Sequence, residues 1–155
     1  MIGDVHLACD LPLTARLRAQ AAALLVPGAL LACGAVVGFG SAAWIHSGWP
    51  QSMPPDLVDL IVPPRVRRRT GPDGPRIRQM RLPGDQVQLI AGLPVTTAAR
   101  TVADLARDLP PTRAQTAMAA VGQATGITAS DVLRCLDAMP RARGSVRARE
   151  VVEAW

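Results

Sequence analysis

The sequence predicts an α+β fold: two N-terminal helices, a small antiparallel sheet with an arginine-rich hairpin, and a four-helix C-terminal part. Three observations lead to this prediction. Alanine-rich apolar residues occupy positions 13–46, short β-rich runs punctuated by Pro and Gly occupy 57–91, and segments with helix-start signals occupy 96–155. A chain of 155 residues, 49% of them hydrophobic, can bury one core. We therefore expect a single domain over 13–155, preceded by a short strand or wing remnant at 1–12.

The apolar segment at residues 21–45 has two interpretations. It contains no charged residue over 25 positions, which is long enough to span a membrane, and Arg16 and Arg18 just before it could form a cytoplasmic anchor. However, a proline and four glycines interrupt it, and it is richer in Ala and Gly than in Leu and Ile. We therefore favour a pair of packed helices, the first from about Leu13 to Val26 and the second ending near His46, over a small membrane-anchored protein.

Three or four strands are expected next. "LVDLIV" (57–62) is apolar and β-rich, which predicts a buried strand. "RVRRR" and "RIRQM" flank "TGPDGP", whose glycines and prolines predict the turn of a hairpin. "QVQLIA" (86–91) alternates apolar and polar residues and predicts a further strand.

The predicted hairpin gathers positive charge on one face. Residues 63–81 hold seven arginines against one aspartate, whereas the whole chain has a net charge of +5 and no lysine. If the turn pairs Arg69 with Arg76, then Arg65, Arg67 and Arg78 lie on the same face as this pair, and Val66 and Ile77 turn inward. Facing like charges destabilise a strand pair. The arrangement therefore favours an anionic partner over a hairpin that is merely solvated.

Helix-start signals mark the C-terminal part. Thr96 or Thr97 is the expected cap of a first helix, and Thr128 with Asp131 forms a shortened capping box for a later one. Arg100 precedes Asp104 by four residues, a spacing that pairs side chains along a helix.

Few residues suggest catalysis. The two histidines, His6 and His46, are forty residues apart, the acidic residues are scattered, and no nucleotide-binding, hydrolase or metalloprotease motif occurs. We predict a protein that is not an enzyme and that has no catalytic residues, cofactor or metal.

The cysteines point to a reducing compartment. Cys9, Cys33 and Cys135 are odd in number, widely spaced and never in a CxxC pair. We interpret them as small buried apolar residues of a cytoplasmic protein.

Three stretches resemble the AbiEi-type antitoxins. Residues 41–48 are similar to the family's "sAAwlhG" signature, with the glycine one residue late, and residues 92–106 look like its "GipVTspaRTllDla" segment. The second match covers these positions: Gly92, Pro94, Val95, Thr96, Arg100, Thr101, Asp104, Leu105 and Ala106. The segment from Ala119 to the C-terminus follows the family's helix, Gly, helix, "rrG", helix ending. The resemblance covers about residues 13–155.

This resemblance implies a type IV toxin–antitoxin antitoxin or a related actinobacterial transcriptional regulator. Such proteins pair a winged helix-turn-helix with this domain and autoregulate their operon. No complete winged helix fits before Leu13, and the chain stops where many relatives continue into an endonuclease-like domain, so nuclease activity is not expected. For Arg100, Thr101 and Asp104 we favour a structural role at a helix start.

The combined prediction is an antitoxin-like regulator that binds DNA, mainly at the phosphate backbone. Its expected contacts are the seven arginines of the hairpin: Arg65, Arg67, Arg68, Arg69, Arg76, Arg78 and Arg81. The alternative is a protein-interaction module whose basic surface meets an acidic partner, such as a cognate nucleotidyltransferase-like toxin. No small-molecule substrate is expected.

Overall fold

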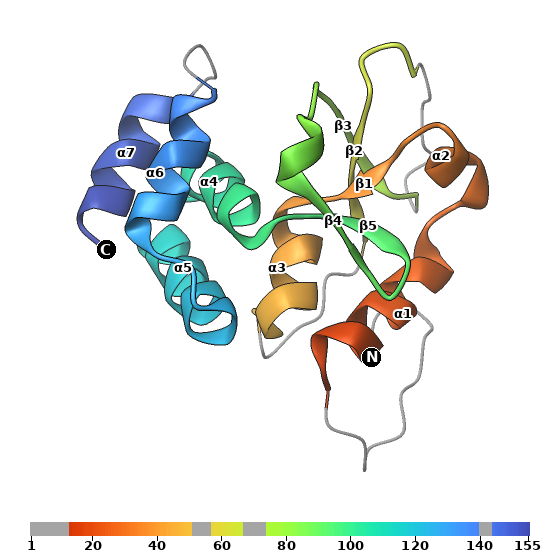
Figure 1. Cartoon of the computed structure of the whole chain (residues 1–155), viewed down its shortest axis with the longest axis horizontal. Helices are drawn as coiled ribbons and strands as arrows, with labels where there is room; N and C mark the ends of the chain where they lie inside the picture. Colours follow the sequence, from red (N-terminus) through yellow and green to blue (C-terminus); the bar gives the residue numbers. More distant parts are fainter. Residues whose placement is uncertain (1–12, 51–56, 67–73, 140–143) are drawn as a thin grey trace.

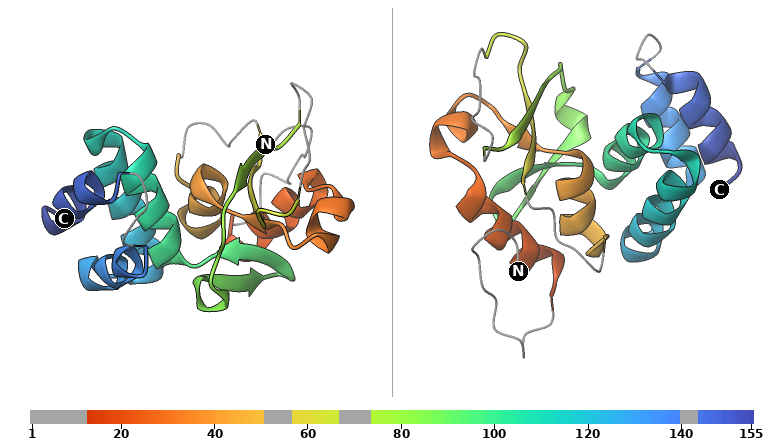
Figure 2. Two further views of the ribbon diagram at one scale, coloured as in Figure 1. Left: turned by 90° about the horizontal axis from the view of Figure 1, so that it is seen from above. Right: turned by 180° about the vertical axis from the view of Figure 1, so that it is seen from behind.

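The computed structural model describes residues 13–50, 57–66, 74–139 and 144–155, and it confirms an α+β fold (Figure 1). The sheet and the N-terminal helices lie on one side of the molecule, and the C-terminal helices lie on the other (Figure 2). The strand or wing remnant predicted at 1–12 falls outside the described residues.

The N-terminal part contains three helices and a short strand within the described residues. They are α1 (Ala15–Leu25), α2 (Gly28–Ala32), β1 (Val36–Val37) and α3 (Phe39–Ser47). Thr14 caps α1 by accepting a hydrogen bond from the Leu17 backbone N–H at 3.2 Å. The second of the two predicted helices is in fact two helices, α2 and α3, which are separated by the strand β1. Gly34, with φ of +85°, adopts a left-handed conformation that ends α2, which explains the interruption.

The apolar segment 21–45 is thus divided among the end of α1, α2, β1 and most of α3. Among the residues that the structure describes, no helix has both the length and the apolar character needed to cross a membrane.

Five strands form one sheet within the described residues, in the order β3-β2-β1-β5-β4. Their bounds are β2 (Asp59–Val62), β3 (Arg76–Gln79), β4 (Val87–Ile90) and β5 (Leu93–Thr96), with a 3₁₀ turn, η1 (Gly84–Gln86), before β4. β1 pairs with β2, and β4 with β5, in antiparallel fashion. β1–β5 and β2–β3 are parallel.

The sheet is therefore mixed, whereas the sequence predicted an antiparallel one. The main difference concerns β3, which pairs in parallel with β2 so that Arg76 lies opposite Asp59 and Arg78 opposite Ile61. The hairpin partners predicted for β3 include Arg67 and Arg69, which lie outside the described residues. A turn signal such as "GPDGP" indicates a reversal of the chain but does not fix which strand the returning segment joins.

Four C-terminal helices were predicted, and four are observed in the described residues: α4 (Ala98–Asp108), α5 (Pro111–Thr125), α6 (Ala129–Asp137) and α7 (Ser145–Glu153). The Thr97 side chain caps α4. Thr128 and Asp131 form the predicted capping box of α6.

The molecule has two apolar cores that share α3. One core lies among the C-terminal helices and includes Phe39 and Ala43, and the other lies between the sheet and the N-terminal helices and includes Ala42 and Ile45. Because α3 is buried on nearly all sides, its apolar, alanine-rich composition matches its place in the fold. The small side chains let α3 pack closely against both halves of the molecule.

The cysteines differ in their exposure. Cys135 is buried in the helical core, whereas Cys33, after α2, is partly exposed, and Cys9 lies outside the described residues. Burial raises the pKa of the Cys135 thiol to about 11.

Cys135 should therefore react slowly with iodoacetamide. Only the thiolate reacts, and a pKa of about 11 leaves roughly one thiol in a thousand ionised at pH 8. Peptide mass spectrometry of the folded protein should find Cys33 alkylated well before Cys135, and the Cys135 rate should rise as the pH increases toward 11. Unfolding in urea should remove the difference between the two. Equal rates in the folded protein would contradict the buried position of Cys135.

Candidate nucleic-acid interface

The ends of the parallel strands β2 and β3 bring two predicted arginines together. Parallel neighbours place their carboxyl ends at the same edge of a sheet. Arg65 follows β2 by three residues and Arg81 follows β3 by two, and both are exposed. They line one groove of about 470 Å³ whose remaining lining is largely apolar and includes Ile61 and Val87. No ion pair or hydrogen bond joins either guanidinium to another described residue.

The strand β3 separates its arginines from its apolar residue. Ile77 lies opposite Leu60 and packs against the core between the sheet and the N-terminal helices, as predicted. Val66 also packs against this core, but it lies at the end of a turn after β2 and not in the predicted strand. Arg76 and Arg78 lie on the other face, because alternate residues of a strand point to opposite sides. Arg76 is exposed. Among the described strands β3 ends the sheet, so this charged face borders an edge of the sheet.

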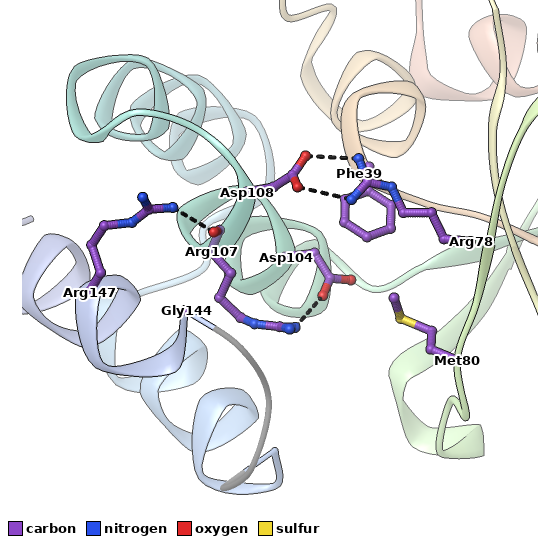
Figure 3. Close-up of a pocket in the computed structure, with 8 residues that line it drawn as sticks. All are labelled: Phe39, Arg78, Met80, Asp104, Arg107, Asp108, Gly144 and Arg147. Atoms are coloured by element: carbon purple, nitrogen blue, oxygen red, sulfur yellow. Dashed lines mark hydrogen bonds and ion pairs between the residues drawn. The ribbon is translucent and has the colours of Figure 1, made fainter.

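Arg78 has a protein partner instead of being free. Its guanidinium donates two hydrogen bonds to the Asp108 carboxylate on α4, at 2.9 and 2.8 Å, and lies over the Phe39 ring at 4.0 Å from its centroid (Figure 3). The hydrogen bonds with Asp108 raise the pKa of Arg78, and those with Arg78 lower the pKa of Asp108. This ion pair links the sheet to the helical part of the molecule.

A cleft of about 670 Å³ opens beside this pair, between β3 and the helices α4 and α7 (Figure 3). Arg107 donates to Asp104 at 3.1 Å, and Arg147 donates to the Arg107 backbone carbonyl at 2.6 Å. The cleft lining thus contains three guanidinium groups and two carboxylates: Arg78, Arg107, Arg147, Asp104 and Asp108.

Arg100 and Asp104 form a buried ion pair. Arg100 is 2% exposed and Asp104 0%, and the Arg100 Nε donates to Asp104 at 2.8 Å. Arg100 also donates to the Gln86 side-chain oxygen at 2.5 Å and to the Met80 sulfur at 3.0 Å. Burial raises the pKa of Asp104, and its hydrogen bond with Arg100 opposes that rise. The pair joins α4 to the segment between β3 and β4, so its role is structural.

Two further polar side chains hold the start of α4. The Thr101 hydroxyl, which is buried, lies 2.7 Å from that of Thr96 and donates to the Thr97 carbonyl at 2.9 Å. His46 is also buried, and its Nε2 lies 2.8 Å from the Thr96 carbonyl. Burial lowers the pKa of His46. Through this contact His46, near the end of α3, joins that helix to the end of β5.

Sequence reasoning missed the partners that lie far away in the chain. Asp108 is thirty residues from Arg78, and Gln86 and Met80 are fourteen and twenty residues from Arg100, so no local spacing relates them. Of the seven predicted contact residues, Arg65, Arg76, Arg78 and Arg81 are described, whereas Arg67, Arg68 and Arg69 lie outside the described residues.

These features define a small α+β domain with a buried Arg–Asp pair between α4 and the segment that follows β3, and with exposed arginines beside β2 and β3. The model of the AbiEi antitoxin C-terminal domain matches residues 34–154, and the chain belongs to that family. Searches of curated proteins and of solved structures gave no match. The family is regulatory and non-enzymatic, which supports an antitoxin or regulatory role with a toxin or DNA as the general kind of partner.

Proposed function

We propose that this chain is an antitoxin-type transcriptional regulator domain that binds DNA through the arginine-rich segment 65–81. The supporting observation is the exposure of Arg65, Arg76 and Arg81 beside β2 and β3. Arg65 and Arg81 line one groove at the carboxyl ends of these strands, and Arg76 begins β3 at the opposite end. Guanidinium groups bind phosphate oxygens in a two-pronged geometry. The sequence adds Arg67, Arg68 and Arg69 to the proposed contacts.

The proposed binding is electrostatic and has little base preference. Contacts to phosphate fix the position of a protein on DNA but carry no sequence information. We also propose a cytoplasmic location, because the three cysteines are odd in number and widely spaced, and no CxxC motif occurs.

Replacing Arg65, Arg76 and Arg81 together with alanine should weaken DNA binding and its dependence on salt. The slope of log affinity against log salt concentration should fall by about 0.9 for each phosphate contact that is lost. Fluorescence anisotropy with a labelled duplex at several salt concentrations measures this slope. A second variant, with Arg67, Arg68 and Arg69 replaced by alanine, tests the other half of the segment.

The matched control replaces three exposed arginines on other elements: Arg16, Arg113 and Arg134. It lowers the net charge by the same amount, so its slope should stay near that of the original protein. If both segment variants keep the original slope, the arginine-rich segment is not the DNA contact.

A second candidate function is binding of an acidic protein, such as a cognate nucleotidyltransferase-like toxin. The apolar lining of the groove beside Arg65 and Arg81 favours it, because apolar side chains of a protein could fill such a groove while its carboxylates meet the arginines. Copurification with the product of a neighbouring gene, together with no binding to DNA, would support this second function.

A further inference from the structure

Arg78 belongs to the arginine-rich segment proposed to bind DNA, but its guanidinium is bound by the carboxylate of Asp108. It lies two residues from the exposed Arg76 and on the same face of β3. Its partner Asp108 comes from α4, on the far side of the cleft.

The Asp108 carboxylate holds Arg78 in the same manner as a phosphate would. The two parallel hydrogen bonds, at 2.9 and 2.8 Å, form the two-pronged geometry that arginine uses for carboxylates and for phosphates alike. Both side chains of this pair are 39% exposed. Because solvent reaches the pair, a competing anion can reach it as well, and exposed ion pairs are weak enough to exchange partners.

The surroundings of Arg78 hold its guanidinium in place for an anion. The Phe39 ring supports it from one side, with the cation 4.0 Å from the ring centroid. Phe39 itself has a φ of +51°, a conformation that is rare outside glycine, so the fold holds this ring in position against local strain. Arg107 and Arg147 also line the cleft, and against Asp104 and Asp108 they leave its lining with one more positive than negative side chain (Figure 3).

We propose that Arg78, supported by Phe39 at the mouth of this cleft, is a phosphate-binding subsite that Asp108 occupies in the unliganded protein. When nucleic acid lies along β3, a backbone phosphate and the Asp108 carboxylate compete for Arg78, so the original protein makes this phosphate contact in only a fraction of the bound molecules. The subsite rests on the proposed DNA binding for its natural ligand, and its chemistry is that of any phosphate group. Asp108 therefore sets how many phosphates the domain contacts.

The Asp108→Asn variant tests this proposal with the same duplex and the same salt series. The amide carries no charge and no longer competes with phosphate for Arg78, so the salt slope should steepen by up to about 0.9, the value for one full phosphate contact. Between 50 and 200 mM salt, one such contact corresponds to an extra loss of affinity of about 3.5-fold. Adding Arg78→Ala to Asp108→Asn should abolish the gain.

Asp137→Asn is the matched control. Asp137 is also an exposed aspartate that pairs with an arginine, Arg149, so its replacement removes the same charge and the same kind of contact elsewhere. Its slope should stay at the original value. Equal slopes for Asp108→Asn and Asp137→Asn, with both variants folded by circular dichroism, would overturn the proposal.

Inorganic phosphate separates this proposal from that of DNA binding. In proton–nitrogen spectra of the arginine Nε–H groups, phosphate should shift the Arg78 signal of Asp108→Asn much more than that of the original protein, at constant ionic strength. The Arg78→Ala variant identifies the signal. A shift without DNA binding supports the subsite while refuting the proposed function, whereas DNA binding that depends on Arg65, Arg76 and Arg81 without a shift refutes the subsite alone.

Discussion

Replacing Asp104 with alanine should lower the free energy of unfolding by about 3–5 kcal/mol, the usual loss when one partner of a buried ion pair is removed. Arg100 is 2% exposed and would keep its charge inside the protein without the carboxylate. Arg107 would lose the same partner. Urea unfolding followed by circular dichroism measures the difference.

Asp137→Ala provides the comparison for this prediction. It removes an aspartate from an exposed pair with Arg149, and exposed pairs contribute about 0–1 kcal/mol. Replacing both Arg100 with Met and Asp104 with Leu should recover part of the loss, because no isolated charge then stays buried. An Asp104→Ala protein as stable as Asp137→Ala would show that the buried pair does not hold the two halves of the molecule together.

The buried Arg100–Asp104 pair also lies within the most specific part of the family resemblance. Arg100, Thr101 and Asp104 belong to the segment that resembles the "GipVTspaRTllDla" motif, and the sequence predicted that they organise a helix start. The structure confirms the contact between Arg100 and Asp104. It also shows that Arg100 donates hydrogen bonds to Gln86 and Met80, which lie outside α4. The i,i+4 spacing revealed the contact, whereas burial depends on distant parts of the chain.

Local signals predicted the elements that depend on neighbouring residues. Thr97 and the Thr128–Asp131 box cap α4 and α6 because a cap involves atoms within one turn. The inward position of Ile77 also followed from alternation along β3. Val66 packs against the same core, but from the turn after β2 and not from the strand that the sequence predicted.

The pairing of β3 could not be predicted from those signals. Residues 63–75 separate β2 from β3, a length that allows a crossover between parallel strands as well as a wide hairpin. The choice depends on burying Ile77 beside Leu60 and on placing Arg78 against α4, and both contacts involve residues far apart in sequence. The same holds for the shared position of α3, because an Ala-rich helix fits equally well into one core or between two.

Replacing Arg18 with methionine should lower the free energy of unfolding by about 3–6 kcal/mol, since it removes two hydrogen bonds from a charged group and each contributes roughly 1.5–3 kcal/mol. Arg18 on α1 is buried, and it donates to the carbonyls of Ile45 and His46 at 3.0 and 3.3 Å. These carbonyls end α3 and lack their usual helical donors. The residue four after His46 is Pro50, which has no N–H, and the Trp49 N–H donates to the Ser47 hydroxyl.

Arg16→Met is the control, because Arg16 lies one half-turn earlier on the same helix and is exposed. Its replacement should change the free energy of unfolding by no more than about 0.5 kcal/mol. From the sequence, Arg16 and Arg18 were equivalent members of a pair that could anchor a membrane segment. In the structure, only Arg18 donates hydrogen bonds to the last carbonyls of α3. Methionine keeps the apolar part of the side chain, so the difference between the two variants measures the lost hydrogen bonds and the lost positive charge at the α3 C-terminus. Equal stabilities of the two variants would mean that solvent satisfies the Ile45 and His46 carbonyls as well as Arg18 does.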